Sequence, residues 1–384
     1  MNMASTSVKR RFEELDLARA LPLLLLPLVH VYEEFESINA LPESLLANYS
    51  WILKLCNLMP SVFMILMGAN IYFSRKSTAK DLLKRGLTFI GIGLGLNFFR
   101  FILPTIITSL INGDFDAIFG EYGTLYYTLS PDIYDFVGIA FIVFAAFKAM
   151  KFSPLAILLA SSAMLAIDGI IPQFETSCLN LNAFLGRFIY MDEDSCFPLL
   201  TWMIFPAVGY CFGCVYKGFE TEEKRCSFVK KMFATSLVGL LVVWFSLLSY
   251  KLDPMLIMTS PANDYITDFP NVLLLTFLAG IWFAMFYFIY FRIKETKLCK
   301  SLIVISKGIL PFYIAQWIVI GWAEYLADGL TDYEDYSLFS YTDFWILTVI
   351  TTLVAVVTVP VYNKIKAKKK EKNVSRISTE VHAA

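Results

Sequence analysis

Charged residues are scarce in this chain: they make up 17% of its 384 residues, while hydrophobic residues make up 57%. A typical soluble domain carries about 25% charged residues, so this scarcity, together with a mean hydropathy of +0.61, excludes an ordinary soluble protein. Lipid must surround much of the chain. The 32 Lys and Arg nearly balance the 33 Asp and Glu. The net charge therefore identifies no partner, and we expect no nucleic acid among the partners.

Cysteines at metal-ligand spacing in a polar segment are also lacking. Of the seven cysteines, Cys211 and Cys214 form a CxxC pair, but this pair lies inside an apolar run. That setting favours a packing role over zinc or redox chemistry, and we expect no metal. Cys178 and Cys196 bracket a segment of mixed polarity on the expected outer side. There a disulfide and a pair of buried thiols remain equally open.

Long apolar runs are what the chain does have. A transmembrane helix needs about 20 mostly apolar residues, and the first such run lacks the small-residue cleavage site of a signal peptide. Ten runs have this character, starting near Leu17, Ile52, Gly86, Ile133, Ser153, Phe197, Lys231, Asn271, Ser301 and Phe344. The sequence therefore predicts an all-α transmembrane bundle of about ten helices, which forms one domain over residues 1–363.

Basic and acidic connections alternate along the chain. Only Lys54, Arg100, Arg187 and Lys251, out of 32 basic residues, fall outside the side of the membrane that carries the N-terminus, the even-numbered connections and the C-terminal segment. Basic connections remain in the cytoplasm. We therefore expect both termini there, in a multi-pass protein of the cell membrane. We expect the basic segment 364–384 to be a disordered cytoplasmic tail.

The first apolar run carries a stripe of polar side chains. Arg19 and His30 are eleven residues apart, close to three helical turns, so both point the same way. Asp16 lies one turn before Arg19, and Glu34 lies one turn after His30. Because such a stripe is unfavourable against lipid, it must face the interior of the bundle.

Four further runs place an unusual residue at the depth of His30. At 1.5 Å per residue, Arg100, Asp168 and Gln316 lie roughly 21 to 22 Å from the cytoplasmic ends of their helices, and His30 about 20 Å. Trp202 reaches the same level from the other side. We interpret this layer as the floor of a polar cavity. Structural alternatives stay open: His30, Gln316 and Asn97 as links between helices, and Arg100 with Asp168 as a buried ion pair.

The first run resembles the start of the transmembrane acyltransferase superfamily, which comprises bacterial acyltransferase-3 proteins and relatives of heparan-alpha-glucosaminide N-acetyltransferase. The resemblance rests on Arg11, Leu15-Asp16, Arg19-Ala20 and His30. Three further segments resemble the second group: PSVFMILMGANIYFSRK with LLKRG, CFPLLTWMIFPAVGYCFG, and ILPFYIAQWIVI. Two positions depart from the pattern: Ala20 stands where the family often has Gly, and Gln316 where many acyltransferase-3 members have His.

The resemblance implies an enzyme that binds acyl-CoA, normally acetyl-CoA, from the cytoplasm and acylates a hydroxyl or amine of an extracytoplasmic saccharide or glycoconjugate. Arg19, Arg85 and Asp16 would then serve the donor, with the arginines meeting phosphates. His30 would be the general base, oriented by Glu33 or Glu34. The acceptor would meet residues of the polar layer: Asn97, Arg100, Asp168, Trp202 and Gln316.

A second hypothesis is a transporter or flippase for a small polar or lipid-linked molecule, because a polar layer suits that function too. Transporters often show inverted repeats or paired broken helices, and we find neither in the sequence. A receptor or scaffold would explain neither the stripe nor the layer. The oligomeric state, including a homo-oligomer, stays open.

Overall fold

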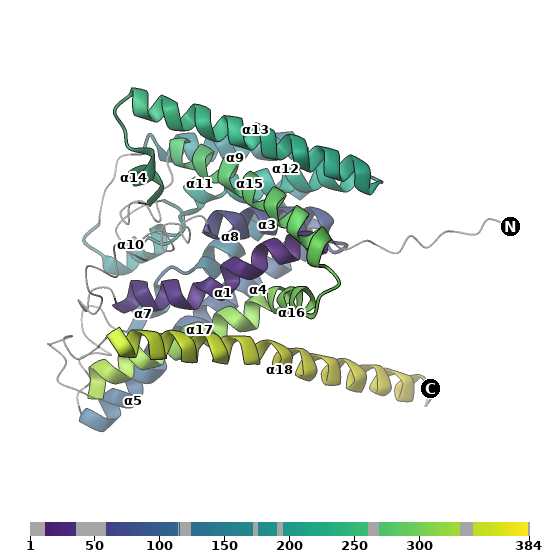
Figure 1. The fold of residues 1–384 in the computed structure, drawn as a ribbon. Helices are drawn as coiled ribbons and strands as arrows, with labels where there is room; N and C mark the ends of the chain where they lie inside the picture. The colour runs from purple at the N-terminus through teal and green to yellow at the C-terminus, as the bar shows by residue number, and fades with distance from the viewer. Residues whose placement is uncertain are drawn as a thin grey trace.

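The computed structural model describes residues 12–35, 59–113, 115, 124–171, 176–189, 195–259, 269–330 and 341–382. Throughout these ranges the regular structure is helical, which confirms the all-α polytopic class. The long helices lie roughly side by side in one bundle (Figure 1). Within the described residues, seven helical segments are long and apolar enough to cross a membrane, and two shorter apolar helices accompany them.

The described part of each of the ten predicted runs is largely helical; residues 52–58, at the start of the second run, lie outside the described residues. Seven runs correspond to single helices: α1 (Glu13–Phe35), α3 (Met59–Phe73), α8 (Ile133–Ala149), α9 (Pro154–Asp168), α13 (Glu222–Ser249), α15 (Phe269–Ile293) and α18 (Tyr341–His382). The other three are divided: α4 (Ala79–Asn97), η2 (Phe98–Ile102) and α5 (Leu103–Asn112); α11 (Leu199–Trp202) and α12 (Ile204–Gly218); α16 (Lys297–Lys307) and α17 (Ile309–Leu330). Three short helices complete the described residues: α7 (Thr124–Leu129), α10 (Leu179–Leu185) and α14 (Pro254–Thr259).

The start of α1 and the end of α18 lie at one end of the bundle, while α7, α10 and α14 lie at the other (Figure 1). We call these the basic end and the acidic end, after the charge of their connections. At the basic end, four helices begin at a Ser or Thr whose side chain accepts a hydrogen bond from the backbone N–H three residues on: Thr78, Ser153, Thr221 and Thr296. Such caps satisfy backbone donors that a helix start leaves unpaired.

Small residues allow the tightest helix pairs. In α4 and α8, a Cβ added to Gly86 would lie 2.6 Å from the carbonyl oxygen of Gly138, and one added to Gly138 would lie 2.9 Å from that of Gly86. Gly68 of α3 and Gly209 of α12 meet the partner backbone in the same way. Close backbone approach through small residues is typical of helix packing in membranes.

The basic C-terminal segment continues the last helix. α18 runs as one helix to His382 and so includes most of residues 364–384. The physical reason is composition: after Pro360 the segment has no Pro or Gly and is rich in Lys, which favours helix. The helix therefore extends beyond the bundle at the basic end (Figure 1).

Helix α1 lies in the middle of the bundle and packs against α3, α15, α16, α17 and α18. Its neighbours are held by specific contacts as well as apolar packing. The indole Nε1 of Trp282 in α15 donates to the carbonyl oxygen of Ala18 at 2.8 Å. This central position places the polar stripe of α1 in the interior, as the spacing predicts.

Candidate active site

His30 lies in a pocket of aromatic and amide groups supplied by α17. Its Nδ1 is 3.1 Å from Nε2 of Gln316. Its ring stacks on Trp317, with centroids 4.5 Å apart, and meets Tyr313 edge-on at 5.8 Å. Only 9% of the residue is exposed. Because Tyr313, Gln316 and Trp317 follow one another at helical spacing, one face of α17 surrounds the imidazole.

Arg100 contacts the same aromatic residue, Trp317, on which His30 stacks. It is the central residue of the π-helical turn η2, and its guanidinium is 4.6 Å from the Trp317 ring centroid and 4.1 Å from that of Phe101. A π-turn inserts one residue into a helix and is frequent at functional sites. Phe98 and Phe99 remain exposed on the outside of the bundle while Arg100 is buried.

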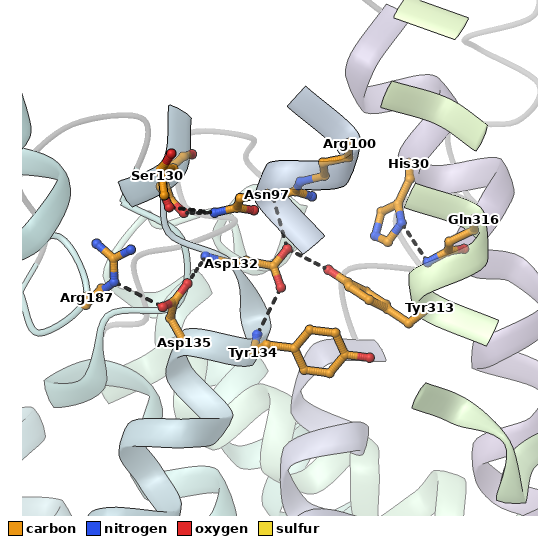
Figure 2. Close-up of polar contacts among 11 residues, drawn as sticks. His30, Asn97, Arg100, Ser130, Asp132, Tyr134, Asp135, Arg187, Tyr313 and Gln316 are labelled. Atoms are coloured by element: carbon orange, nitrogen blue, oxygen red, sulfur yellow. Dashed lines mark hydrogen bonds and ion pairs between the residues drawn. The ribbon is translucent and has the colours of Figure 1, made fainter. Parts of the chain in front are cut away.

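The partner of Arg100 is Asp132, at 3.2 Å between Nη2 and Oδ2 (Figure 2). The hydroxyl of Tyr313 donates to the same carboxylate oxygen at 3.3 Å. Asp132 is also the N-cap of α8, where it forms a reciprocal capping box with Asp135. One carboxylate thus joins the start of α8 to η2 and α17. The ion pair that we considered between Arg100 and Asp168 is not formed.

A second buried ion pair supports this arrangement. Arg187 donates from Nε to Asp135 at 3.2 Å and from Nη1 to the carbonyl oxygen of Ala183 at 2.6 Å. Asn97, one turn before Arg100, donates to the carbonyl oxygens of Thr128 and Ser130. These contacts hold the segment before α8 in place and so fix the position of Asp132.

Two adjoining cavities connect the basic end with His30. The mouth cavity, about 370 Å³, is lined by Phe12, Leu15, Asp16, Arg19, Leu66, Asn70, Phe73, Ser74, Arg75 and Arg85. The inner cavity, about 280 Å³, shares Arg19, Asn70 and Arg85 with it and reaches His30, Tyr134 and Tyr313. Between these polar ends its walls are apolar, with Phe63, Met64, Met67, Phe89, Val137 and Phe141 among them.

The predicted donor residues come together at the mouth cavity. Arg19 donates to Asp16 at 3.0 Å and to the hydroxyl of Ser306 at 3.1 Å. Arg85 donates to the hydroxyl of Ser74 at 3.2 Å. Arg75, which was not among the predicted donor residues, adds a third guanidinium to this lining. The mouth cavity is therefore rich in the groups that recognise phosphate.

Some of the residues predicted to surround His30 lie close to it in the structure, and others do not. Gln316, not Glu33 or Glu34, contacts Nδ1 of His30; Glu33 is exposed, and Glu34 shares a hydrogen bond with Glu324. Arg100 contacts Trp317, on which His30 stacks, and Asn97 lies one turn before Arg100; neither these two residues nor Gln316 lines either cavity.

Trp202 and Asp168 take positions away from His30. Trp202 packs in the core against Phe197 and Phe205, and Asp168 is the last residue of α9. Neither lines a cavity described above. Cys178 and Cys196 are both thiols, so the alternative of a disulfide between them is not realised. Within the described ranges no three metal-ligating side chains come together.

The predicted site residues did not include Asp132, Tyr134, Tyr313 and Trp317. The D-x-x-D spacing of Asp132 and Asp135 before an apolar run was the available signal, because it matches a helix N-cap. Tyr313 and Trp317 lie within a turn of Gln316 on α17, so the prediction for Gln316 indicated the correct helix but not its aromatic neighbours.

The model of the family described as heparan-alpha-glucosaminide N-acetyltransferase, catalytic, matches residues 11–250, which is more than half of the chain. No curated protein and no solved structure matched the chain. The matched region contains His30, Arg100, Asp132 and the arginines of the mouth cavity, whereas α17 lies beyond it. This match favours the acyltransferase over the transporter or flippase.

Proposed function

Because the chain belongs to the family of heparan-alpha-glucosaminide N-acetyltransferase catalytic domains, we propose that this membrane acyltransferase takes an acyl group from acyl-CoA at the basic end and passes it to a saccharide at the acidic end. The observation that carries the proposal is the pair of adjoining cavities: arginines at one end, apolar walls between, and the imidazole of His30 at the other.

The mouth cavity suits the phosphates of CoA. Arg19, Arg75 and Arg85 line it, and a planar guanidinium can donate two parallel hydrogen bonds to one phosphate group. Asp16 holds Arg19 in place by their 3.0 Å ion pair, so its role toward the donor is to orient that guanidinium. In this arrangement both chain termini are cytoplasmic, as the alternation of charged connections predicts.

The inner cavity suits the long, flexible arm of CoA that carries the thioester. Its apolar walls exclude water from the thioester, and the methionines Met64 and Met67 adapt their shape to an occupant. Arg19 and His30 line the inner cavity at its two ends and are eleven residues apart on one helix. That spacing corresponds to roughly 16 Å along the helix axis. A thioester that reaches His30 is therefore compatible with phosphates held at Arg19.

His30 acts in the proposal as the general base that removes the proton from the attacking hydroxyl or amine. A neutral imidazole accepts a proton on one nitrogen while the other bears hydrogen. When Nε2 of Gln316 faces Nδ1 of His30, the hydrogen of the imidazole resides on Nε2 of His30. In this orientation Oε1 of Gln316 is buried without a hydrogen-bond partner. Half a turn of the amide puts Oε1 against an Nδ1–H and leaves Nε2 of His30 as the base.

The acceptor meets polar groups beyond His30. Nε of Arg100, Nε1 of Trp317 and Oε1 of Gln316 are buried and have no hydrogen-bond partner within the described part of the chain. Buried polar atoms normally have a hydrogen-bond partner. Unpaired polar atoms on Trp317 and Gln316, which contact His30, and on Arg100, which contacts Trp317, therefore support a polar ligand here. Once the amide has turned, Nε2 of Gln316 takes the place of Oε1 as the free atom, so these three side chains offer N–H donors to the hydroxyl oxygens of a sugar.

A purified-protein assay tests the proposal. Labelled acetyl-CoA is offered with glucosamine or with glucose, which differ in carrying an amine or a hydroxyl at one carbon. We expect acetyl transfer and CoA release with at least one sugar; the preferred sugar distinguishes N- from O-acylation. The His30→Ala protein, which should still bind CoA, is the control. The proposal would be contradicted if the protein binds CoA but transfers acetyl to neither sugar and releases no CoA from acetyl-CoA.

A further inference from the structure

Acyl transfer needs a hydrogen-bond donor for the thioester oxygen as well as a base. As the acceptor attacks, its electron pair forms the new C–O or C–N bond, and the carbonyl π electrons move onto oxygen. Collapse of this intermediate breaks the C–S bond, and the CoA sulfur leaves with the electron pair and takes the proton that His30 removed. Donors placed in advance around the developing oxyanion are usually a large part of catalysis.

Few side chains at the inner end of the path can donate that bond. Among the described residues lining the inner cavity, the polar ones are Arg19, Asn70 and Arg85, which also line the mouth cavity, and His30, Tyr134 and Tyr313. His30 is assigned to proton transfer. The remaining candidates for the hydrogen-bond donor to the thioester oxygen are therefore the hydroxyls of Tyr134 and Tyr313.

The two hydroxyls differ in their partners. Tyr313 donates to the carboxylate of Asp132, which also pairs with Arg100, and a bond to a charged acceptor is strong. Tyr134 donates only to the neutral carbonyl oxygen of Leu310, at 3.4 Å, which is long for an O–H···O bond. The hydroxyl of Tyr134 can therefore leave its present acceptor at little energetic cost.

The ring of Tyr134 is held firmly even though its hydroxyl bond is weak. Its backbone N–H donates to Asp132 at 3.0 Å in the cap of α8. The ring stacks near Phe89 at 5.9 Å and meets Tyr313 edge-on at 5.0 Å. Figure 2 shows it extending from the start of α8 toward α17, beneath Tyr313. A fixed ring with an adaptable hydroxyl is what preorganised stabilisation requires.

We propose that Tyr134 is a catalytic residue whose hydroxyl donates a hydrogen bond to the thioester oxygen as it becomes an oxyanion. The inference rests on the proposed function and adds a residue to it. Two side chains that line one cavity then have complementary roles: His30 accepts the proton of the acceptor, and Tyr134 stabilises the negative charge on the thioester oxygen.

The test compares Tyr134→Phe with Tyr210→Phe in acetyl transfer from acetyl-CoA to the preferred sugar. Loss of one oxyanion donor typically lowers kcat by about 100- to 1000-fold. We expect that loss for Tyr134→Phe, with KM for acetyl-CoA and binding of CoA unchanged. Tyr210 is a buried tyrosine of α12 that lines neither cavity, so Tyr210→Phe should keep normal kcat.

A normal kcat for Tyr134→Phe would overturn the inference while leaving the proposed function intact. An inactive wild-type protein would instead contradict the proposed function. If Tyr134→Phe fails to fold, fluorotyrosines at position 134 decide, because they keep the shape and change only the acidity of the hydroxyl. A kcat that follows that acidity supports the inference, and a kcat insensitive to it contradicts the inference.

Discussion

Nε2 of Gln316 lies 3.1 Å from Nδ1 of His30, and the orientation of this one amide decides which nitrogen of the imidazole can accept a proton. When the amide nitrogen faces the ring, Nδ1 accepts and Nε2 carries the hydrogen. When the amide oxygen faces the ring, Nδ1 donates and Nε2 is available as a base. Gln316 is therefore a positioning residue for proton transfer, from a helix that packs against α1.

Gln316→Leu should lower kcat by roughly 10- to 100-fold, the effect of losing a hydrogen bond worth about 1–3 kcal/mol. Gln316→Glu should retain activity, because a carboxylate can only accept and so enforces the tautomer with Nδ1–H. The chain has two histidines, so ¹⁵N spectra of the His382→Ala protein report the tautomer of His30 alone. Equal kcat for wild type and Gln316→Leu would show that the amide has no such role.

The arginines of the mouth cavity should govern donor affinity. Arg19→Ala and Arg85→Gln should each raise KM for acetyl-CoA much more than KM for the sugar, because phosphate pairing acts on the donor alone. The effect should shrink at high salt, since screening weakens exposed ion pairs. Lys224→Gln is the control, because Lys224 is a basic residue of the same end that lines neither cavity. An unchanged KM in well-folded variants would assign both arginines to structural roles.

The contact between α17 and the π-turn should be essential for the site. A Cβ on Gly321 would lie 2.5 Å from the carbonyl oxygen of Arg100, and Trp322 donates to the carbonyl oxygen of Phe99 at 2.8 Å. Gly321→Ala must therefore displace α17, with Gln316 and Trp317 on it.

We expect the Gly321→Ala substitution to destabilise the protein by about 1–3 kcal/mol, as overpacking does, and to lower kcat. The matched control is Gly95→Ala, because a Cβ at Gly95 would meet nothing within 4 Å. Thermal unfolding and acetyl transfer measure the two effects. Equal melting temperatures and rates for the two variants would contradict the tight contact.

The orientation of the bundle can be tested on a single helix. Lys224 and Tyr250 are exposed near opposite ends of α13. In a cysteine-free background, Tyr250→Cys should react with an impermeant thiol reagent added outside intact cells, and Lys224→Cys should react only after lysis. The reverse result would exchange the donor and acceptor sides.

Spacing along the chain predicted the stripe of α1 because helical geometry fixes which residues share a face. Depth predicted that Arg100 and Gln316 lie at the level of His30. Depth alone does not say where around the bundle a residue lies, so the depths calculated for Asp168 and Trp202 could not show that these residues lie away from His30. The partner of Arg100 was missed because Asp132 precedes an apolar run. Such a position indicates the start of a helix, and only the tertiary fold brings the carboxylate of Asp132 next to Arg100 of η2.

The family resemblance and the aromatic surroundings were predictable to different degrees. The pattern from Arg11 to His30 indicated the family, and the match over residues 11–250 confirms it. Tyr134, Tyr313 and Trp317 are ordinary residues in apolar helices. Their contacts with His30 and with one another depend on how α8 and α17 approach α1, which no local pattern specifies.

The acyl-transfer rate of the His30→Gln protein tests the central claim most directly. Glutamine can keep a hydrogen bond to its neighbours but cannot accept the proton, and positioned proton transfer typically contributes about 10²- to 10⁴-fold in rate. We predict a loss of that size in kcat, equal to the loss for His30→Ala, with CoA binding and melting temperature nearly unchanged. A His30→Gln protein with near-normal kcat would contradict the account, because His30 would then only link helices.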